Sequence, residues 1–165
     1  MRIAYFIGFL ACCGLLGYAY YLQHVQFLDP CPLCIFQRIA FFGMAALFLL
    51  GAIHDPDGWG GRTYAMLISL AGLLGAALAG RHAYLQSLPP DQVPECGPGL
   101  TYMLDTLPFT EVLGRVLSGS GECAEVAWTF LGLSMPWWTL IWFVGLTGWA
   151  LLFGWKSTRR HIFLD

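Results

Sequence analysis

Four long apolar stretches constrain the fold of this chain more than any other feature. They are Ile3–Leu22, Ile35–Ile53, Thr63–Gly80 and Trp137–Trp155. Each reaches or approaches the roughly 20 residues that an α-helix needs to cross the hydrocarbon core of a bilayer. Of the 165 residues, 58% are hydrophobic and only 11% are charged, whereas about a quarter are charged in soluble domains. We therefore predict an all-α membrane protein, a bundle of four transmembrane helices that forms one domain over residues 1–165.

A cleaved signal peptide is the alternative interpretation of the first stretch. Arg2 would supply its basic start. However, the stretch is longer than the apolar region of a signal peptide, and no A-x-A-like cleavage site follows it. Tyr18, Tyr20 and Tyr21 cluster at its end, as aromatic residues do where a helix leaves the membrane. We therefore expect this helix to be retained.

The third apolar stretch, Thr63–Gly80, is rich in small residues. Gly72, Gly75 and Ala76 give it a smooth surface on which another helix can pack closely. We expect this stretch to form close helix contacts.

The positions of Lys and Arg predict how the helices are oriented, because cytoplasmic loops carry more of these residues. If four helices alternate in direction, one side receives Arg2, Arg62, Lys156, Arg159 and Arg160. The other side receives Arg38, Arg81 and Arg115. The first side is predicted to be cytoplasmic, with both termini and an inner loop at about 54–62. The outer, periplasmic side then receives loops at about 23–34 and 83–136.

The longer outer loop, at about 83–136, is predicted to have two parts. Pro89–Gly99 contains four prolines and two glycines, so it cannot form regular helix or strand, and we expect it to be mobile. Leu100–Leu117 has the apolar pattern of a short amphipathic helix that lies at the membrane interface. Ser118–Glu122 is rich in serine and glycine and is expected to be a flexible link to Cys123.

Four of the six cysteines fall on the predicted outer side: Cys31, Cys34, Cys96 and Cys123. That side of a bacterial membrane is oxidising, so disulfides can persist there. For Cys96 and Cys123 one interpretation is a structural staple, since cross-linking a long loop restricts the unfolded chain. For Cys31 and Cys34 that interpretation is poor, because a bridge across two residues closes almost no loop. A C-x-x-C pair is instead typical of thiol–disulfide exchange.

Cys34 and Arg38 are expected to lie together at the start of the second helix. The first turn of a helix presents free backbone N–H groups and the positive end of the dipole, which stabilise a thiolate. Arg38 follows Cys34 by four residues and shares its helix face. A charged residue inside a spanning helix marks a functional site by default, here one that stabilises a thiolate or a reduced, negatively charged cofactor. The alternative is that Arg38 only extends its side chain to the membrane interface.

These motifs resemble one known family. Cys31–Arg38, with the sequence CPLCIFQR, resembles the C-x-L-C-I-[YF]-[EQ]-R signature of the DsbB family of disulfide-bond-generating membrane proteins. Gly121–Glu125 and Phe130–Pro136 resemble that family's second outer loop, and His82–Gln86 resembles the end of its third helix. The resemblance covers nearly the whole chain, with four cysteines in the family's order. Ser134 stands where some relatives carry an acid, which leaves the cysteine motifs intact.

The resemblance implies a function, a location and partners. Family members are four-helix proteins of the bacterial inner membrane that reoxidise a soluble, periplasmic DsbA-type dithiol oxidase and pass the electrons to membrane quinone. The implied cofactor is ubiquinone or menaquinone, and the implied partners are the DsbA-like oxidase, the quinone pool and the lipid bilayer. Arg38 matches the family's quinone-site arginine. His82, which by itself would be taken for an interfacial residue, matches a quinone-pocket histidine.

The resemblance also implies roles for the four cysteines. Cys96, paired with Cys123, corresponds to the sulfur that DsbA attacks. Cys31 and Cys34 correspond to the pair that takes electrons from this loop disulfide. Cys34 corresponds to the member of that pair that faces the quinone.

Other interpretations stay open at the level of sequence. A vitamin K epoxide reductase-like protein also joins quinones to thiols on four helices, but its loop cysteines precede its C-x-x-C pair. A membrane metal-binding or transport subunit could use Cys31, Cys34, His24 and His82, because thiolates bind Cu(I) and Zn. The lack of polar residues through the helix middles argues against a permeation path. A DsbB paralogue with a dedicated partner is a third alternative.

The net charge of −2 gives no basic footprint for nucleic acid, and we expect no metal site and no nucleic-acid partner.

Overall fold

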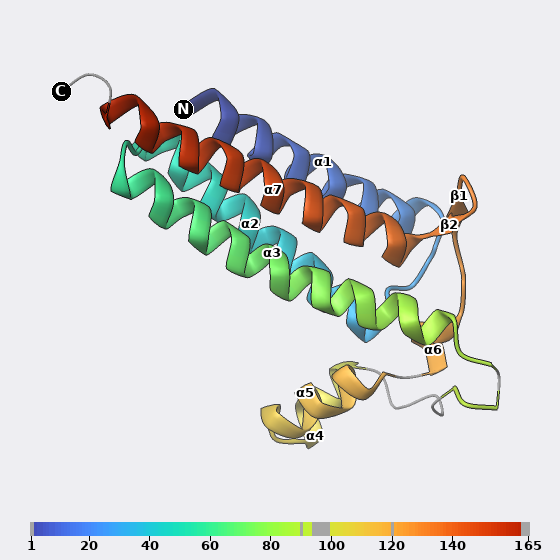
Figure 1. The fold of residues 1–165 in the computed structure, drawn as a ribbon. Helices are drawn as coiled ribbons and strands as arrows, with labels where there is room; N and C mark the ends of the chain where they lie inside the picture. Colours follow the sequence, from blue (N-terminus) through green and yellow to red (C-terminus); the bar gives the residue numbers. More distant parts are fainter. Residues whose placement is uncertain (1, 90, 94–99, 120, 163–165) are drawn as a thin grey trace.

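The computed structural model describes residues 2–89, 91–93, 100–119 and 121–162, without the side chains of residues 101 and 156–162. Four long helices run side by side (Figure 1): α1 (Arg2–Val25), α2 (Pro32–His54), α3 (Trp59–Gln86) and α7 (Met135–Ile162). Each has a span long and apolar enough to cross a membrane. The predicted all-α bundle of four membrane helices is therefore confirmed. Cys96, in the segment that was expected to be mobile, lies outside the described residues.

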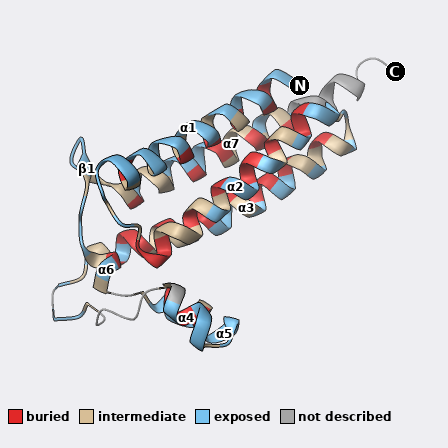
Figure 2. Cartoon of the chain, turned by 180° about the vertical axis from the view of Figure 1, so that it is seen from behind, coloured by how far each residue is buried: buried red, intermediate tan, exposed pale blue. Residues whose placement is uncertain are grey.

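The interior of the bundle is packed with aromatic and aliphatic side chains. In Figure 2 the buried residues lie along the inner sides of the long helices, and their outer sides are exposed. Phe41 of α2 stacks on Phe143 of α7, with 4.0 Å between the ring centroids. The outward residues include many large apolar side chains, such as Leu73, Leu74 and Val144. An apolar outer surface of this kind suits contact with lipid, as expected for a membrane bundle.

Helices α3 and α7 have the most extensive contact in the bundle, and glycines make it possible. A Cβ atom at Gly75 would overlap the ring of Phe143, and one at Gly72 would overlap the hydroxyl of Thr147. The absence of side chains at these positions lets α7 approach the backbone of α3. The small-residue face that the sequence predicted on the third stretch is thus where α7 packs.

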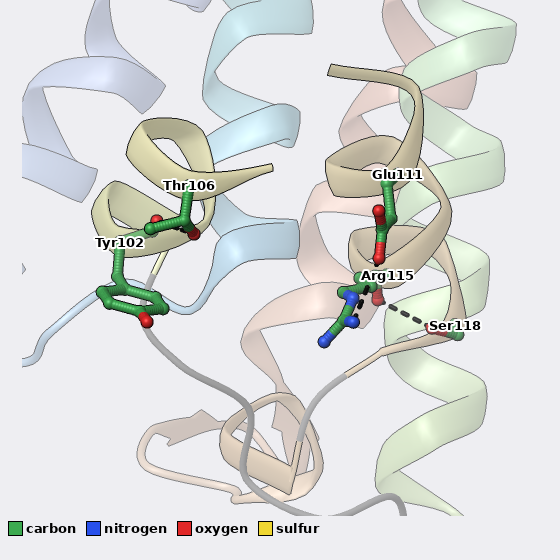
Figure 3. Close-up of polar contacts among 5 residues, drawn as sticks. All are labelled: Tyr102, Thr106, Glu111, Arg115 and Ser118. Atoms are coloured by element: carbon green, nitrogen blue, oxygen red, sulfur yellow. Dashed lines mark hydrogen bonds and ion pairs between the residues drawn. The ribbon is translucent and has the colours of Figure 1, made fainter. Parts of the chain in front are cut away.

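In its described residues the long loop contains three short helices, α4 (Leu100–Thr106), α5 (Phe109–Ser118) and α6 (Gly121–Ala124). The predicted single helix over 100–117 is two helices, because Pro108 restricts the residue before it and begins a new helix as the N-cap of α5. Figure 3 shows their local contacts: the hydroxyl of Thr106 donates to the carbonyl of Tyr102, and Arg115 pairs with Glu111 at 3.1 Å.

The end of α3 holds the long loop over one end of the bundle, where α1 ends and α2 begins; we call this the Cys31 end. Arg81 donates to the carbonyl oxygens of Leu117 and Ser118, at 3.1 and 2.9 Å. Gly119, with φ +88°, lies directly against Leu85, where a side chain would collide. Further along, α6 begins at Gly121, inside the stretch that was expected to be a flexible link. A short hairpin of β1 (Thr129–Phe130) and β2 (Leu133–Ser134) then leads into α7.

Candidate functional site

Cys31 and Cys34 form the N-terminal turn of α2. Cys31 is the N-cap residue, Pro32 follows as the first helical residue, and the backbone N–H of Cys34 donates to Cys31 Sγ at 3.4 Å. Proline suits this position because its fixed φ is helical and the N–H that it lacks would have no helical partner. The helix therefore begins at Pro32, before the apolar stretch itself, and both sulfur atoms lie at its N-terminus, as predicted for Cys34.

His82 lies beside both sulfur atoms. Cys31 Sγ and Cys34 Sγ are 3.2 Å apart. His82 Nε2 is 3.8 Å from Cys31 Sγ, and His82 Nδ1 is 3.9 Å from Cys34 Sγ. The histidine comes from α3, 48 residues from Cys34, and its side chain is buried. The structure thus brings His82 to the cysteine pair, from which the sequence analysis had selected it separately.

The same three side chains are chemically suited to hold a soft metal ion, because two thiolates and an imidazole lie within 4.8 Å of one another. His24, the fourth residue of the metal-binding alternative, is not part of this group. Its ring stacks on Tyr20 instead, with 6.2 Å between the centroids.

Sequence reasoning missed two polar residues of this site, Gln37 and Thr139. Gln37 Nε2 lies 3.2 Å from His82 Nδ1, and the hydroxyl of Thr139 on α7 lies 2.9 Å from Gln37 Oε1. A signal was present, since a polar residue inside a predicted spanning helix is a functional candidate by default. Nothing in the sequence, however, showed that Gln37 and Thr139 would meet across 102 positions of the chain.

Arg38 is half-buried and is held by the end of α1. Its guanidinium donates to the side-chain oxygen of Gln23 and, at 3.2 Å, to the carbonyl oxygen of Ala19. The guanidinium carbon also lies 5.2 Å from the centroid of the Tyr20 ring. The charge is therefore satisfied within the protein, by polar and aromatic groups of a neighbouring helix.

An apolar cavity of about 450 Å³ lies beside Cys34 and Arg38. Its wall comes from α1, α2, α7 and the β1 region, and is mainly aliphatic and aromatic: Leu15, Leu16, Tyr18, Ala19, Phe41, Trp128, Phe130, Met135, Trp138 and Trp142. The polar side chains in the wall are Cys34, Gln37, Arg38 and Thr139. A concave, mostly apolar space with a few convergent polar groups is typical of a site for a small molecule or cofactor.

A second cavity, of about 280 Å³, is lined by both cysteines of the pair. Cys34 and Arg38 border both cavities, whereas Cys31 and His82 border only the second. This cavity is more polar, because it is also lined by three acids and a glutamine: Asp29, Glu122, Glu125 and Gln86. Cys34 therefore borders both an apolar space and a more polar one.

Cys123, on α6, packs near the same pair. Its side chain is 1% exposed and belongs to a buried apolar cluster with Cys31, Leu33 and Leu85. The structure thus brings three of the four selected cysteines to the Cys31 end. The pairing of Cys123 with Cys96 stays a prediction, because Cys96 lies outside the described residues.

Comparison with known proteins identifies the family. Residues 1–153 match the model of the family described as disulfide bond formation protein DsbB. A disulfide bond formation protein B from Hahella chejuensis is 57% identical over 160 residues, which are 96% of this chain and 96% of that protein. The protein of the same name from Methylococcus capsulatus is 51% identical over 158 residues, again 96% of both chains. That from Xanthomonas campestris pv. campestris is 51% identical over 156 residues, 94% of this chain and 91% of the relative. The chain therefore belongs to the DsbB family and is a multi-pass membrane thiol oxidoreductase that acts in disulfide bond formation.

Proposed function

We propose that this protein reoxidises a DsbA-type dithiol oxidase in the bacterial periplasm and passes the electrons through two cysteine pairs to membrane quinone, either ubiquinone or menaquinone. One observation carries the proposal: Cys34 borders both an apolar cavity and a more polar one, and Cys31 borders the more polar one. A catalyst that joins water-borne thiols to a lipid-borne acceptor needs its reactive sulfurs at such a boundary.

The four cysteines act in sequence in this proposal. The dithiol of the soluble partner reduces the disulfide between Cys96 and Cys123, with Cys96 as the sulfur that the partner attacks. A thiolate of the reduced loop pair then attacks the Cys31–Cys34 disulfide. Each exchange transfers two electrons and two protons and leaves the donor pair as a disulfide. The burial of Cys123 in the cluster that contains Cys31 supports this second exchange, since it brings the loop next to the receiving pair.

The apolar cavity fits a quinone. Its aliphatic and aromatic wall suits a lipid-soluble ring, and its volume is in the range of ligand sites. Bound quinone would accept two electrons and two protons. Cys34 offers the sulfur at that wall, and Arg38 offers a planar donor group that orients a quinone oxygen and stabilises negative charge. His82 borders the neighbouring cavity, against both sulfurs, so its part in the quinone pocket stays a prediction from the resemblance.

The proposed orientation places both termini in the cytoplasm and the Cys31 end in the periplasm. Arg2 donates to the carbonyl oxygen of Ala52 at 3.0 Å, and the guanidinium of Arg62 lies 5.9 Å from the Trp155 ring. Both arginines are thus at the end opposite Cys31. Their position supports the proposal because cytoplasmic helix ends are enriched in Lys and Arg.

Quinone reduction tests the function directly. The purified protein, supplied with a reduced DsbA-type oxidase, is expected to reduce added quinone, followed by quinone absorbance. Cys34→Ser is expected to abolish the reaction, whereas Cys13→Ser, which changes an exposed cysteine of α1, is expected to leave it unchanged. Folded protein that reduces no quinone and contains stoichiometric copper or zinc would favour the metal-binding alternative instead.

Cys31 and Cys34 are expected to be oxidised to each other in membranes that contain quinone. The spacing of the pair and the 3.2 Å between its sulfurs allow this bond without a large movement of the backbone. Acid trapping followed by a mass-tagging thiol reagent measures it. Two free thiols in quinone-replete cells would contradict the expectation.

Cys123→Ser is expected to accumulate a mixed disulfide between Cys96 and the soluble oxidase. Cys123 is buried, whereas Cys96 belongs to the proline-rich segment Pro89–Gly99 that was expected to be mobile. With Cys123 absent, the bond from Cys96 to the partner has no resolving thiol. Non-reducing electrophoresis with peptide mapping detects the complex, and trapping that occurs only through Cys123, in Cys96→Ser, would reverse the two roles.

A further inference from the structure

The proposed electron path does not explain the largely buried polar group formed by Thr139, Gln37 and His82. It joins α7, α2 and α3 beside the cysteine pair. Gln37 and His82 are each only 3% exposed. Burying polar side chains costs free energy that an apolar residue would not incur, and hydrogen bonds offset this cost only in part. A glutamine at this position of a membrane helix therefore needs a reason beyond helix packing.

The contacts of His82 give that reason, because its two ring nitrogens have different partners. Nδ1 is 3.2 Å from the amide of Gln37, and Nε2 is 3.8 Å from Cys31 Sγ. A hydrogen bond at one nitrogen of a histidine fixes the orientation of the ring and the role of the other nitrogen. In the structure the Gln37 Nε2 amide faces Nδ1 and can only donate to it, so Nε2 of a neutral ring carries its proton toward Cys31. When the amide turns so that Oε1 accepts from Nδ1–H, Nε2 is free to accept a proton from Cys31.

Thr139 in turn holds Gln37. Its hydroxyl lies 2.9 Å from Gln37 Oε1 and also 2.9 Å from the carbonyl oxygen of Pro136. The hydroxyl can donate to either oxygen, and an amide carries both a donor and an acceptor. Gln37 can therefore present an acceptor or a donor to Nδ1, and His82 keeps its partner whether or not Nδ1 carries a proton.

We propose that Gln37, held by Thr139, is a positioning residue that keeps His82 Nε2 against Cys31, so that His82 exchanges a proton with the Cys31 sulfur. This inference rests on the proposed function in one respect, that Cys31 belongs to a pair that is reduced and reoxidised. In the reduced pair each sulfur carries one proton. When the pair is reoxidised, with the quinone of the proposed function as the two-electron acceptor, the Cys31 S–H bond breaks and an N–H bond forms at His82 Nε2, which gives a thiolate and an imidazolium.

The imidazole favours the Cys31 thiolate in either of its own charge states. A neutral ring with Nε2 free accepts the thiol proton, and an imidazolium donates a hydrogen bond to the thiolate and adds a positive charge. Loss of the correct ring orientation should therefore make Cys31 harder to deprotonate. The other titratable or charged groups around this pair come from α2, the loop before it and the end of the long loop: Cys34, Arg38, Asp29, Cys123, Glu122 and Glu125.

The test measures the reactivity of Cys31 without quinone or a soluble partner. Reduced, full-length protein in lipid nanodiscs is treated with iodoacetamide from pH 5 to 9, and modification of Cys31 and Cys34 is quantified separately by fragment-ion mass spectrometry. Gln37→Met and Thr139→Val remove the two hydrogen-bonding side chains, and Thr139→Ser retains the hydroxyl. Thr147→Val is the matched control, because Thr147 is also on α7 and its buried hydroxyl has no hydrogen-bond partner in the described part of the chain.

Gln37→Met is expected to slow alkylation of Cys31 at pH 7 by about fivefold and to move the midpoint of its pH profile upward. Thr139→Val is expected to slow alkylation of Cys31 by a smaller factor and to move the midpoint upward by less. Thr139→Ser and Thr147→Val are expected to keep the wild-type profile. In quinone reduction, Gln37→Met should lower kcat and leave the KM for quinone unchanged.

Three results would overturn the inference. The first is a Cys31 profile in Gln37→Met that superimposes on that of the wild type. The second is a raised quinone KM with unchanged Cys31 reactivity, which would assign Gln37 to the apolar cavity that it also lines. The third is a loss of Cys31 alkylation rate in Thr147→Val that equals the loss in Gln37→Met, which would show that the effect comes from helix packing. Because the alkylation assay contains no quinone, a failure of the proposed quinone reaction would appear separately.

Discussion

Arg38→Ala is expected to raise the apparent KM for quinone by at least about tenfold, which corresponds to roughly 1.4 kcal/mol of lost binding free energy. The guanidinium borders the apolar cavity together with Cys34 and is held in place by Gln23 and Ala19. Arg38→Lys should show an intermediate defect, because an ammonium keeps the charge and loses the planar fork. The measurement is the rate of quinone reduction against quinone concentration.

Two controls separate a role of Arg38 in quinone binding from a general defect. Single-turnover oxidation of the soluble oxidase without added quinone should stay largely intact in Arg38→Ala, since that exchange takes place at the loop cysteines. Arg115→Ala should leave the quinone KM unchanged, because Arg115 is exposed on α5 and pairs only with Glu111 among the described residues. An unchanged quinone KM in Arg38→Ala would restore the alternative that this arginine only extends to the membrane interface.

Gly75→Leu is expected to destabilise the bundle by about 3 kcal/mol or more, at the upper end of the cost of overpacking a core. Even a Cβ at this position would overlap the ring of Phe143, and that ring cannot move away freely because it stacks on Phe41. The added side chain would therefore separate α3 from α7, the most extensive contact in the bundle. Unfolding in mixed micelles of increasing dodecyl sulfate content, followed by circular dichroism, measures the loss.

Gly80→Leu is the matched control for this prediction. It adds the same side chain to the same helix, at a position where a Cβ would meet no atom of the described residues within 4 Å apart from its chain neighbours and the nearby backbone of its own helix. Its effect on stability should be small, or favourable through the higher helix propensity of leucine. Equal losses of stability in the two variants would show that α3 tolerates no leucine for reasons unrelated to its contact with α7.

The chain's sequence by itself determined the four membrane helices and the reactive pair. Helix number follows from the length of the apolar stretches, because a bilayer core of fixed thickness accepts only spans of about 20 residues. The placement of Cys31 and Cys34 at a helix start follows from local chemistry, since Pro32 can occupy the first helical position. A local rule also explains why the helix is interrupted at Pro108, since proline restricts the residue before it. The prediction of one amphipathic helix over 100–117 did not take this rule into account.

The tertiary structure alone decided which side chains meet at the site. It brought His82 of α3 and Thr139 of α7 to Gln37 of α2. It also formed the wall of the apolar cavity partly from Trp128 and Phe130 of the long loop. The physical reason is that a membrane helix is apolar on the side that faces lipid as well as on the side that faces protein. Its hydrophobic pattern therefore does not specify the rotation and relative height of the helices, and these two quantities determine every contact between them.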